Sequence, residues 1–317
     1  MRSVAMTILA AWPLLAASPT KAPPVHQSAY WWVPLWVDPA DPNVAATNLS
    51  AFINNQPVPI AKLLRPDSDL MILMVLDLTG DLALVQPAKE SLVAELAKLP
   101  PNVWVGLLHA QGGLTVLADP TGDHAAVSTF IQSLPISGKS GLWDTVEQVE
   151  TLADDLLHKA DVRVAVLYIT DSDVTNYSED LTNPVINSSD PHDLSRKFPD
   201  SLIRERASRL ERQLSHTSAP LFVLHLQYRP SGLNQSYQSA LGSLAEGTAG
   251  FAAFCRSSGG IPQEIANMFS YIRSSYFLKL GLRPRSSPAL QLRLEWKNED
   301  QPEPHLAYRA RILIKQR

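Results

Sequence analysis

The sequence predicts an α/β protein in which helices cover both faces of a doubly wound, mostly parallel, Rossmann-like sheet. The main observation is a continuously apolar run at 70–76 and three comparable, mainly apolar runs at 103–108, 162–169 and 221–226. Runs that do not alternate with polar residues are typical of strands buried on both faces. Amphipathic segments separate these runs, and this alternation of strands with helices predicts the doubly wound arrangement.

Residues 1–22 have the parts of a secretory signal peptide. Arg2 gives a positive start, and an apolar run over 4–17 precedes small residues. The run is too short to span a bilayer, and Pro13 interrupts it. A buried N-terminal helix is the alternative. Since no later stretch offers about 18 uninterrupted apolar residues, we expect a secreted or periplasmic protein with no membrane span after signal removal.

A linker and a short N-terminal β segment are expected over 23–66. Apolar runs at 32–37 and 51–63 predict strands, and the polar segment 54–56 inside the second run predicts a hairpin turn.

Three helices are expected between the core strands. Apolar residues fall on one face of each of the segments 87–99, 142–157 and 201–214. The Arg and Glu residues of the third segment are most simply its solvated face, with a binding patch as the alternative. These helices and the four core strands place the main domain at 67–272.

The last part of the chain, 273–317, predicts a small antiparallel β extension. Its runs at 276–282, 290–296 and 306–314 alternate, or nearly alternate, between apolar and polar residues. The polar stretch 176–200 contains several prolines and predicts a surface loop.

Composition and charge exclude some classes of function. The net charge is -4 and only 18% of residues are charged, so nucleic-acid binding is not expected. The single cysteine, Cys255, permits no intramolecular disulfide and lies far from the signal segment, which excludes a lipoprotein anchor. We expect Cys255 to be a small buried hydrophobe, with a reactive thiol as the alternative.

Hard oxygen donors follow two of the core strands and precede one helix. Asp77, Thr79 and Asp81 follow the first strand. Asp171 follows the third strand, and Ser140 stands just before the helix at 142. Because ligands bind beyond the carboxyl ends of strands in such sheets, we expect these side chains to meet. A donor set of oxygens without His or Cys suits Mg²⁺, or Ca²⁺ or Mn²⁺, and not zinc.

These residues resemble the metal-ion-dependent adhesion site of von Willebrand factor A (VWA) domains. The family pattern is Asp-x-Ser-x-Ser after the first strand, a Thr in a later loop and an Asp after a following strand. Asp77 and Thr79 correspond to the first Asp and the first Ser. Ser140 corresponds to the loop Thr, and Asp171 to the last Asp. Asp81 departs from the pattern, because it places a carboxylate where the family has its second serine.

The resemblance extends from about residue 33 to the end of the chain. Segments 139–144, 244–250 and 276–284 are similar to those of a secreted VWA subgroup described largely from acidobacterial genomes. The resemblance implies a VWA fold and protein–protein recognition, in which a bound cation bridges to an acidic side chain of the partner. Under it, the five oxygen-donor residues named above would form the metal site.

Two other functions stay open at this point. One is a scaffolding VWA domain with a metal-free site, in which Asp77 caps a turn and Ser140 caps a helix. The other is a metal-assisted hydrolase that uses Asp77, Asp171 and His109. The sequence holds no Gly-x-Ser-x-Gly elbow and no Gly-rich phosphate loop. We therefore predict that the protein is not an enzyme.

Overall fold

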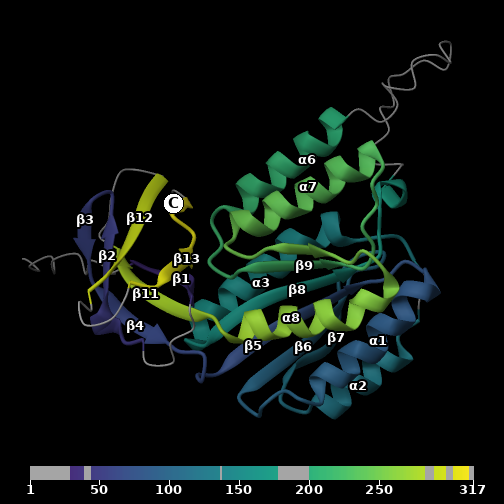
Figure 1. Ribbon diagram of the computed structural model, residues 1–317, viewed down its shortest axis with the longest axis horizontal. Helices are drawn as coiled ribbons and strands as arrows, with labels where there is room; N and C mark the ends of the chain where they lie inside the picture. The colour runs from purple at the N-terminus through teal and green to yellow at the C-terminus, as the bar shows by residue number, and fades with distance from the viewer. Residues whose placement is uncertain are drawn as a thin grey trace, which may run out of the picture.

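The computed structural model describes residues 29–38, 44–135, 138–177, 200–282, 289–297 and 303–313. The predicted signal peptide and most of the polar stretch 176–200 lie outside these ranges. The described residues form two parts, an α/β domain around a six-stranded sheet and a β unit of two four-stranded sheets (Figure 1).

The central sheet has the strand order β10-β9-β8-β5-β6-β7. The strands are β5 (Leu70–Asp77), β6 (Val103–His109), β7 (Thr115–Thr121), β8 (Arg163–Thr170), β9 (Leu221–His225) and β10 (Ala252–Phe254). All neighbours are parallel except β6 and β7, which are antiparallel. Counted along the chain, this is the 3-2-1-4-5-6 order of a doubly wound sheet. The predicted fold class is confirmed.

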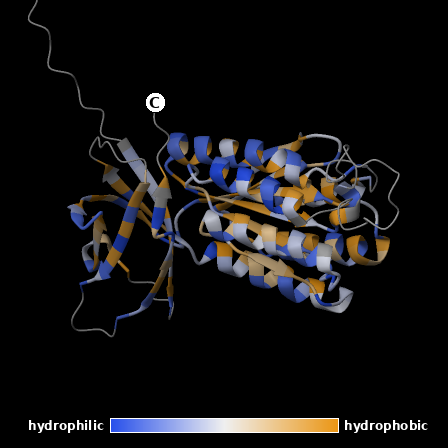
Figure 2. Ribbon diagram, turned by 90° about the horizontal axis from the view of Figure 1, so that it is seen from above, coloured by the Kyte–Doolittle hydropathy of each residue, from blue (hydrophilic) through white to orange (hydrophobic). Residues whose placement is uncertain are grey.

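Helices cover both faces of this sheet (Figure 1). One layer holds α1 (Leu82–Leu96), α2 (His124–Ser133) and α8 (Ile261–Arg273), and the other holds α3 (Leu142–Ala160), α6 (Asp200–Leu214) and α7 (Gly232–Gly247). Successive β5 residues alternate between the layers, so that Met74 packs in the first core and Val75 in the second. Figure 2 shows hydrophobic residues along the central strands and hydrophilic residues on the helices outside them.

Helix α1 begins at Leu82, so the predicted start at Pro87 is wrong. The cause is the capping residue Asp81, whose carboxylate accepts a hydrogen bond from the Ala83 N–H at 3.1 Å. Such a cap satisfies a helix-terminal N–H and favours an early start. Pro87 lies inside the helix, where its missing N–H removes one backbone hydrogen bond.

The β segments from the two ends of the chain pair with each other. The first sheet has the order β13-β1-β11-β4 and the second β14-β12-β2-β3. The strands are β1 (Ala29–Asp38), β2 (Leu49–Ile53), β3 (Gln56–Val58), β4 (Ile60–Leu64), β11 (Tyr276–Leu282), β12 (Ala289–Trp296), β13 (His305–Tyr308) and β14 (Arg311–Leu313). The two sheets share one apolar core and so form a sandwich. The sequence predicts both β segments but not their pairing.

The turn between β2 and β3 matches the predicted hairpin. Asn54 and Asn55 both have positive φ angles, of 50° and 61°. A two-residue hairpin loop with both residues in this region suits the twist of the flanking strands, and Asn tolerates it well.

A buried arginine joins the α/β domain to the β unit. The chain passes between the two parts at 65–69 and again at 274–275. Arg163, the first residue of β8, donates hydrogen bonds of 2.7 to 3.0 Å to carbonyl groups at both crossings, those of Pro66, Ser68, Arg273 and Ser275. Burial lowers the pKa of this guanidinium to about 10. One side chain therefore fixes both connections.

Arg309, between β13 and β14, makes a second contact of this kind. It donates to the carbonyl groups of Ser215 at 2.7 Å and Thr217 at 3.0 Å, in the loop between α6 and β9.

The domain boundaries themselves stay predictions. None of the helices in the described part of the chain has the length and apolar character needed to cross a bilayer.

Candidate functional site

The predicted oxygen donors gather where β5 and β8 end side by side. Asp77 is the last residue of β5 and lies opposite Thr170, the last residue of β8. The next residue, Asp171, donates its N–H to the Asp77 carbonyl at 3.4 Å. β5 and β8 are strands 1 and 4 in the order 3-2-1-4-5-6. The chain adds strands on one side of β5 and then continues from β8 on the other side, so the topological switch point lies between these two strands. Ligands are expected to bind at this point.

Asp77 is fully buried and accepts three hydrogen bonds. Its Oδ1 accepts from the Gly141 N–H at 2.9 Å, and its Oδ2 accepts from Thr170 Oγ1 at 3.0 Å and Ser172 Oγ at 3.2 Å. Burial raises the pKa of this carboxyl from 3.8 to about 6, although the three hydrogen bonds act in the opposite direction. The ionised form of Asp77 is therefore costly in the absence of a cation.

Asp171 is also buried, and the loop after β5 surrounds its carboxylate. Oδ1 accepts from the Thr79 N–H at 2.5 Å and from its Oγ1 at 2.9 Å. Oδ2 accepts from the N–H groups of Gly80 and Asp81, each at 3.1 Å. Gly80 has a φ of 132°, a conformation that side chains rarely adopt. Successive N–H groups at the start of α1 thus form an anion-binding nest that Asp171 fills.

Ser140 lies next to Gly141, whose N–H holds Asp77. Its side chain is buried, and its Oγ has no hydrogen-bond partner among the described residues. A buried hydroxyl without a partner costs about 1–3 kcal/mol. Ser140 Oγ is thus a buried oxygen that makes no hydrogen bond with the described residues, one residue before the Gly141 N–H that bonds to Asp77.

Asp81 is placed differently from the other predicted donors. Its N–H takes part in the nest, but its exposed carboxylate caps α1 through Ala83. The structure therefore brings together Asp77, Thr79, Ser140 and Asp171, and directs the Asp81 carboxylate to the helix terminus. Asp81, the residue that departs from the family pattern in the sequence, is thus also the one whose carboxylate caps α1.

Sequence reasoning missed several buried polar residues under the site. Thr170 and Ser172 bond to Asp77, and Tyr237 of α7 lies 3.1 Å from Ser172 Oγ through its hydroxyl. His225, the last residue of β9, lies 2.6 Å from the Ser172 carbonyl through Nε2. The sequence offered one signal for His225, because a histidine inside the otherwise apolar run at 221–226 must find a buried hydrogen-bond partner.

The residues of the hydrolase alternative are arranged less favourably. His109 ends β6, and its Nε2 lies 2.8 Å from Gln111 Oε1. Gln111 in turn donates to the Leu78 carbonyl. His109 is thereby engaged with the β6–β7 connection.

Cys255 is a buried free thiol whose pKa burial raises to about 11, as expected of a small buried hydrophobe.

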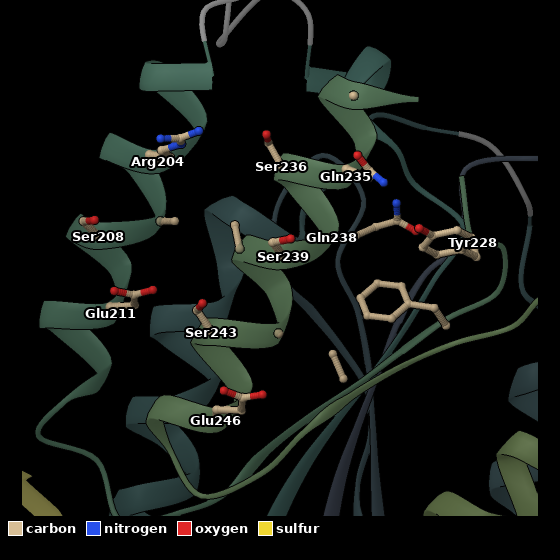
Figure 3. A pocket seen from close by; sticks show the side chains of 16 residues that line it. Arg204, Ser208, Glu211, Tyr228, Gln235, Ser236, Gln238, Ser239, Ser243 and Glu246 are labelled. Carbon is tan, nitrogen blue, oxygen red and sulfur yellow. The ribbon is translucent and has the colours of Figure 1, made fainter. Parts of the chain in front are cut away.

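A separate concave surface lies between α6, α7 and the edge strand β10. Figure 3 shows Ser208 and Glu211 on α6 and Ser236, Ser239 and Ser243 on the neighbouring α7. Its walls are mostly small residues, serine, alanine and glycine, with several longer polar side chains among them, and nothing in the described residues indicates what would occupy it.

No family model and no curated protein matches the chain. Among solved structures, it is similar to the conserved hypothetical protein BatB from Bacteroides thetaiotaomicron, with 14% identity, a TM-score of 0.39, and coverage of 65% of this chain and 98% of that one. It is similar to a von Willebrand factor type A structure from Catenulispora acidiphila, with 10% identity, a TM-score of 0.42, and coverage of 91% and 74%. For the vWF domain of the type V pili tip protein Mfa5 from Porphyromonas gingivalis, the identity is 11%, the TM-score 0.41 and the coverage 69% and 98%.

The chain's own features assign the class. A doubly wound sheet with one antiparallel edge strand carries the Asp77 loop, the Ser140 segment and Asp171 at the carboxyl ends of its strands. The described residues therefore form a doubly wound α/β domain, and the VWA resemblance of the sequence stays a prediction. The particular subgroup suggested by the sequence stays a prediction.

The burial of Asp77 gives a testable pH dependence. Its pKa in the folded protein is about 6, above the ordinary 3.8, so the folded state binds the proton more tightly. The resulting stability is fully present below about pH 4 and is lost as the pH rises through 6. In EDTA, we expect the free energy of unfolding of Asp77→Asn to rise by about 2.4 kcal/mol relative to wild type between pH 4 and pH 8. Urea unfolding at both pH values measures this.

Asp67→Asn is the control for this experiment. Arg65 lowers the pKa of the exposed Asp67 carboxyl below its ordinary 3.8, so Asp67 is ionised in both the folded and unfolded states over most of this range, and the stability difference between Asp67→Asn and wild type should be nearly the same at pH 4 and pH 8. A stability difference between Asp77→Asn and wild type that is the same at both pH values would show that Asp77 titrates as an ordinary carboxyl.

Proposed function

We propose that this domain binds a protein partner through a divalent cation held at the ends of β5 and β8. The observation that supports this most directly is the buried, unpartnered Ser140 Oγ, one residue before the Gly141 N–H that bonds to Asp77. Asp77 and Asp171 would provide carboxylate oxygens, and Thr79 and Ser140 hydroxyl oxygens. Such a set suits Mg²⁺, and also Mn²⁺ or Ca²⁺. Among the described residues, no three His, Cys, Asp or Glu side chains cluster, so the hydroxyl groups are needed.

A cation would relieve an electrostatic cost in this loop cluster. The ionised Asp77 carboxylate is buried, and the nearby charge of Asp171 raises its pKa further. A bound cation would stabilise both ionised groups and would supply a positive centre for a partner's acidic side chain. We infer recognition and not catalysis, in an exported protein that acts in the periplasm or outside the cell.

A second candidate function is a scaffolding domain that binds no cation. The hydrogen bonds of Asp171 favour it, because the Thr79–Asp81 loop already satisfies both carboxylate oxygens. The capping role of Asp81 also leaves its carboxylate occupied. The two candidates differ in whether Mg²⁺ stabilises the fold.

Ser140→Ala separates these functions. With Mg²⁺ or Mn²⁺ at about 100 times its dissociation constant, we expect wild type to gain about 2.7 kcal/mol of stability. Ser140→Ala should lose at least about tenfold in cation affinity. In EDTA, the same variant should be as stable as wild type or more stable, because it removes a buried unpaired hydroxyl. Titration calorimetry with Mn²⁺ and thermal unfolding measure the two effects.

Ser133→Ala is the matched control. Ser133 ends α2, is exposed, and donates to the Phe130 carbonyl at 3.1 Å. This variant should bind the cation as wild type does. A wild-type protein that shows neither heat of binding nor a cation-dependent shift would rule out the cation site and leave the scaffolding function.

A further inference from the structure

His225 lies directly beneath the loop that follows β8. Its ring is buried at the end of β9, and Nε2 lies 2.6 Å from the Ser172 carbonyl oxygen. On the other side of the ring, Nδ1 accepts the Gln227 N–H at 3.2 Å. Because Nδ1 accepts, the proton of the neutral ring is on Nε2, which donates to Ser172. His225 thus links β9 to the loop of the candidate site.

Ser172 is held from two sides by elements outside its own loop. His225 of β9 binds its carbonyl group, and the Tyr237 hydroxyl of α7 lies 3.1 Å from its Oγ. The His225 and Tyr237 rings pack edge to face, with centroids 6.3 Å apart. Phe254 of β10 packs on His225, with ring centroids 5.7 Å apart. Burial and ring packing therefore give His225 a single orientation.

The anchored serine bonds to the Asp77 carboxylate and follows Asp171 directly in the chain. Ser172 Oγ lies 3.2 Å from Asp77 Oδ2 and 2.6 Å from Thr170 Oγ1. Asp171 stands between Thr170 and Ser172 in the chain, so its backbone position depends on the anchoring of both neighbours. Two close carboxylates repel each other unless the surrounding structure holds them. The contact between His225 and Ser172 is one of the constraints that does so.

We infer that His225 is a positioning residue for the proposed cation site. Its Nε2–H fixes the Ser172 carbonyl, and through Ser172 it holds the Asp77 side chain and the backbone of Asp171 in place. The inference rests on the proposed function. Groups that orient the ligands of a metal typically change its affinity by 10- to 100-fold when they are removed.

Three substitutions at this position test the role of the Nε2–H. His225→Gln keeps an amide N–H close to the position of Nε2 and should bind Mn²⁺ within about threefold of wild type. His225→Leu has no donor, and His225→Asn carries its donor too far from Ser172. Both should lose roughly 10- to 100-fold in Mn²⁺ affinity. Titration calorimetry gives the affinities, and circular dichroism shows which variants fold.

Hydrogen exchange in EDTA supplies a readout that needs no cation. Amides of the segment 170–173 should exchange faster in His225→Asn than in His225→Gln, because the loop loses its anchor. Amides of α2, on the opposite face of the sheet, should exchange equally in both. If His225→Leu fails to fold, the comparison of Asn with Gln decides the question.

The outcomes distinguish this inference from the proposed function. A wild-type protein that binds no Mn²⁺ overturns both. If wild type binds Mn²⁺ and the folded Asn or Leu variant binds it within about twofold, only the positioning role is overturned. Equal losses in the Gln and Asn variants would likewise show that His225 supports the fold without orienting the site.

Discussion

Gly141→Ala is expected to lower the free energy of unfolding by about 4 kcal/mol or more, a loss at the far end of single substitutions. A Cβ atom at this position would lie 1.6 Å from the Ala110 carbonyl oxygen. The obstacle is backbone, so no side-chain rotation can relieve the clash. The loop before α3 or the end of β6 has to move.

The displacement should also disturb the candidate site. The Gly141 N–H donates to Asp77, and the Gly141 carbonyl accepts the first hydrogen bonds of α3 from Asp144 and Thr145. Urea unfolding followed by circular dichroism measures the loss of stability. In molecules that still fold, Mn²⁺ titration should show weaker binding, because Asp77 loses one of its three donors.

Gly242→Ala is the matched control. Gly242 lies within α7, and a Cβ atom there would meet no atom within 4 Å. Alanine favours the helix, so this change should stabilise the protein by up to about 1 kcal/mol. If Gly141→Ala were as stable as Gly242→Ala, the close approach of Ala110 to the α3 N-terminus would be wrong.

Arg163→Met is expected to cost about 4 kcal/mol, roughly 1 kcal/mol for each of its four hydrogen bonds to carbonyl groups. Methionine fills much of the same space but donates no hydrogen bond. The carbonyl groups at both crossings between the α/β domain and the β unit would lose this buried donor. Equilibrium unfolding in urea measures the change.

Arg65→Met provides the comparison for Arg163→Met. Arg65 is exposed and pairs with Asp67 at 2.8 Å on the surface. Exposed pairs contribute little, so its loss should change stability by no more than about 1 kcal/mol. Similar losses in the two variants would contradict the clamping role of Arg163. A further expected sign of that role is faster hydrogen exchange at 65–69 in Arg163→Met.

Part of the candidate site was predictable from the sequence. Asp77 and Asp171 follow apolar runs, and parallel strands bring their carboxyl ends to one edge, so their proximity follows from the fold class. The hydrogen bonds within the site did not follow. Asp81 has the chemistry of a metal ligand, but its position at the start of α1 gives its carboxylate a capping role. His225 looks like one more residue of an apolar strand until β8 and β9 lie side by side.

The sequence by itself determined the four central parallel strands, three helices, the α/β class and the Asn54–Asn55 turn, but its periodicity did not predict α2, α7, α8, β7 or β10. Apolar periodicity reports which faces of a segment are buried, and turn residues report local backbone geometry. Only the tertiary structure decided that β1 pairs with β11 and β2 with β12, and that Arg163 binds both crossings. These partners lie far apart in the chain, and periodicity within a segment carries no information about which distant segment becomes its neighbour.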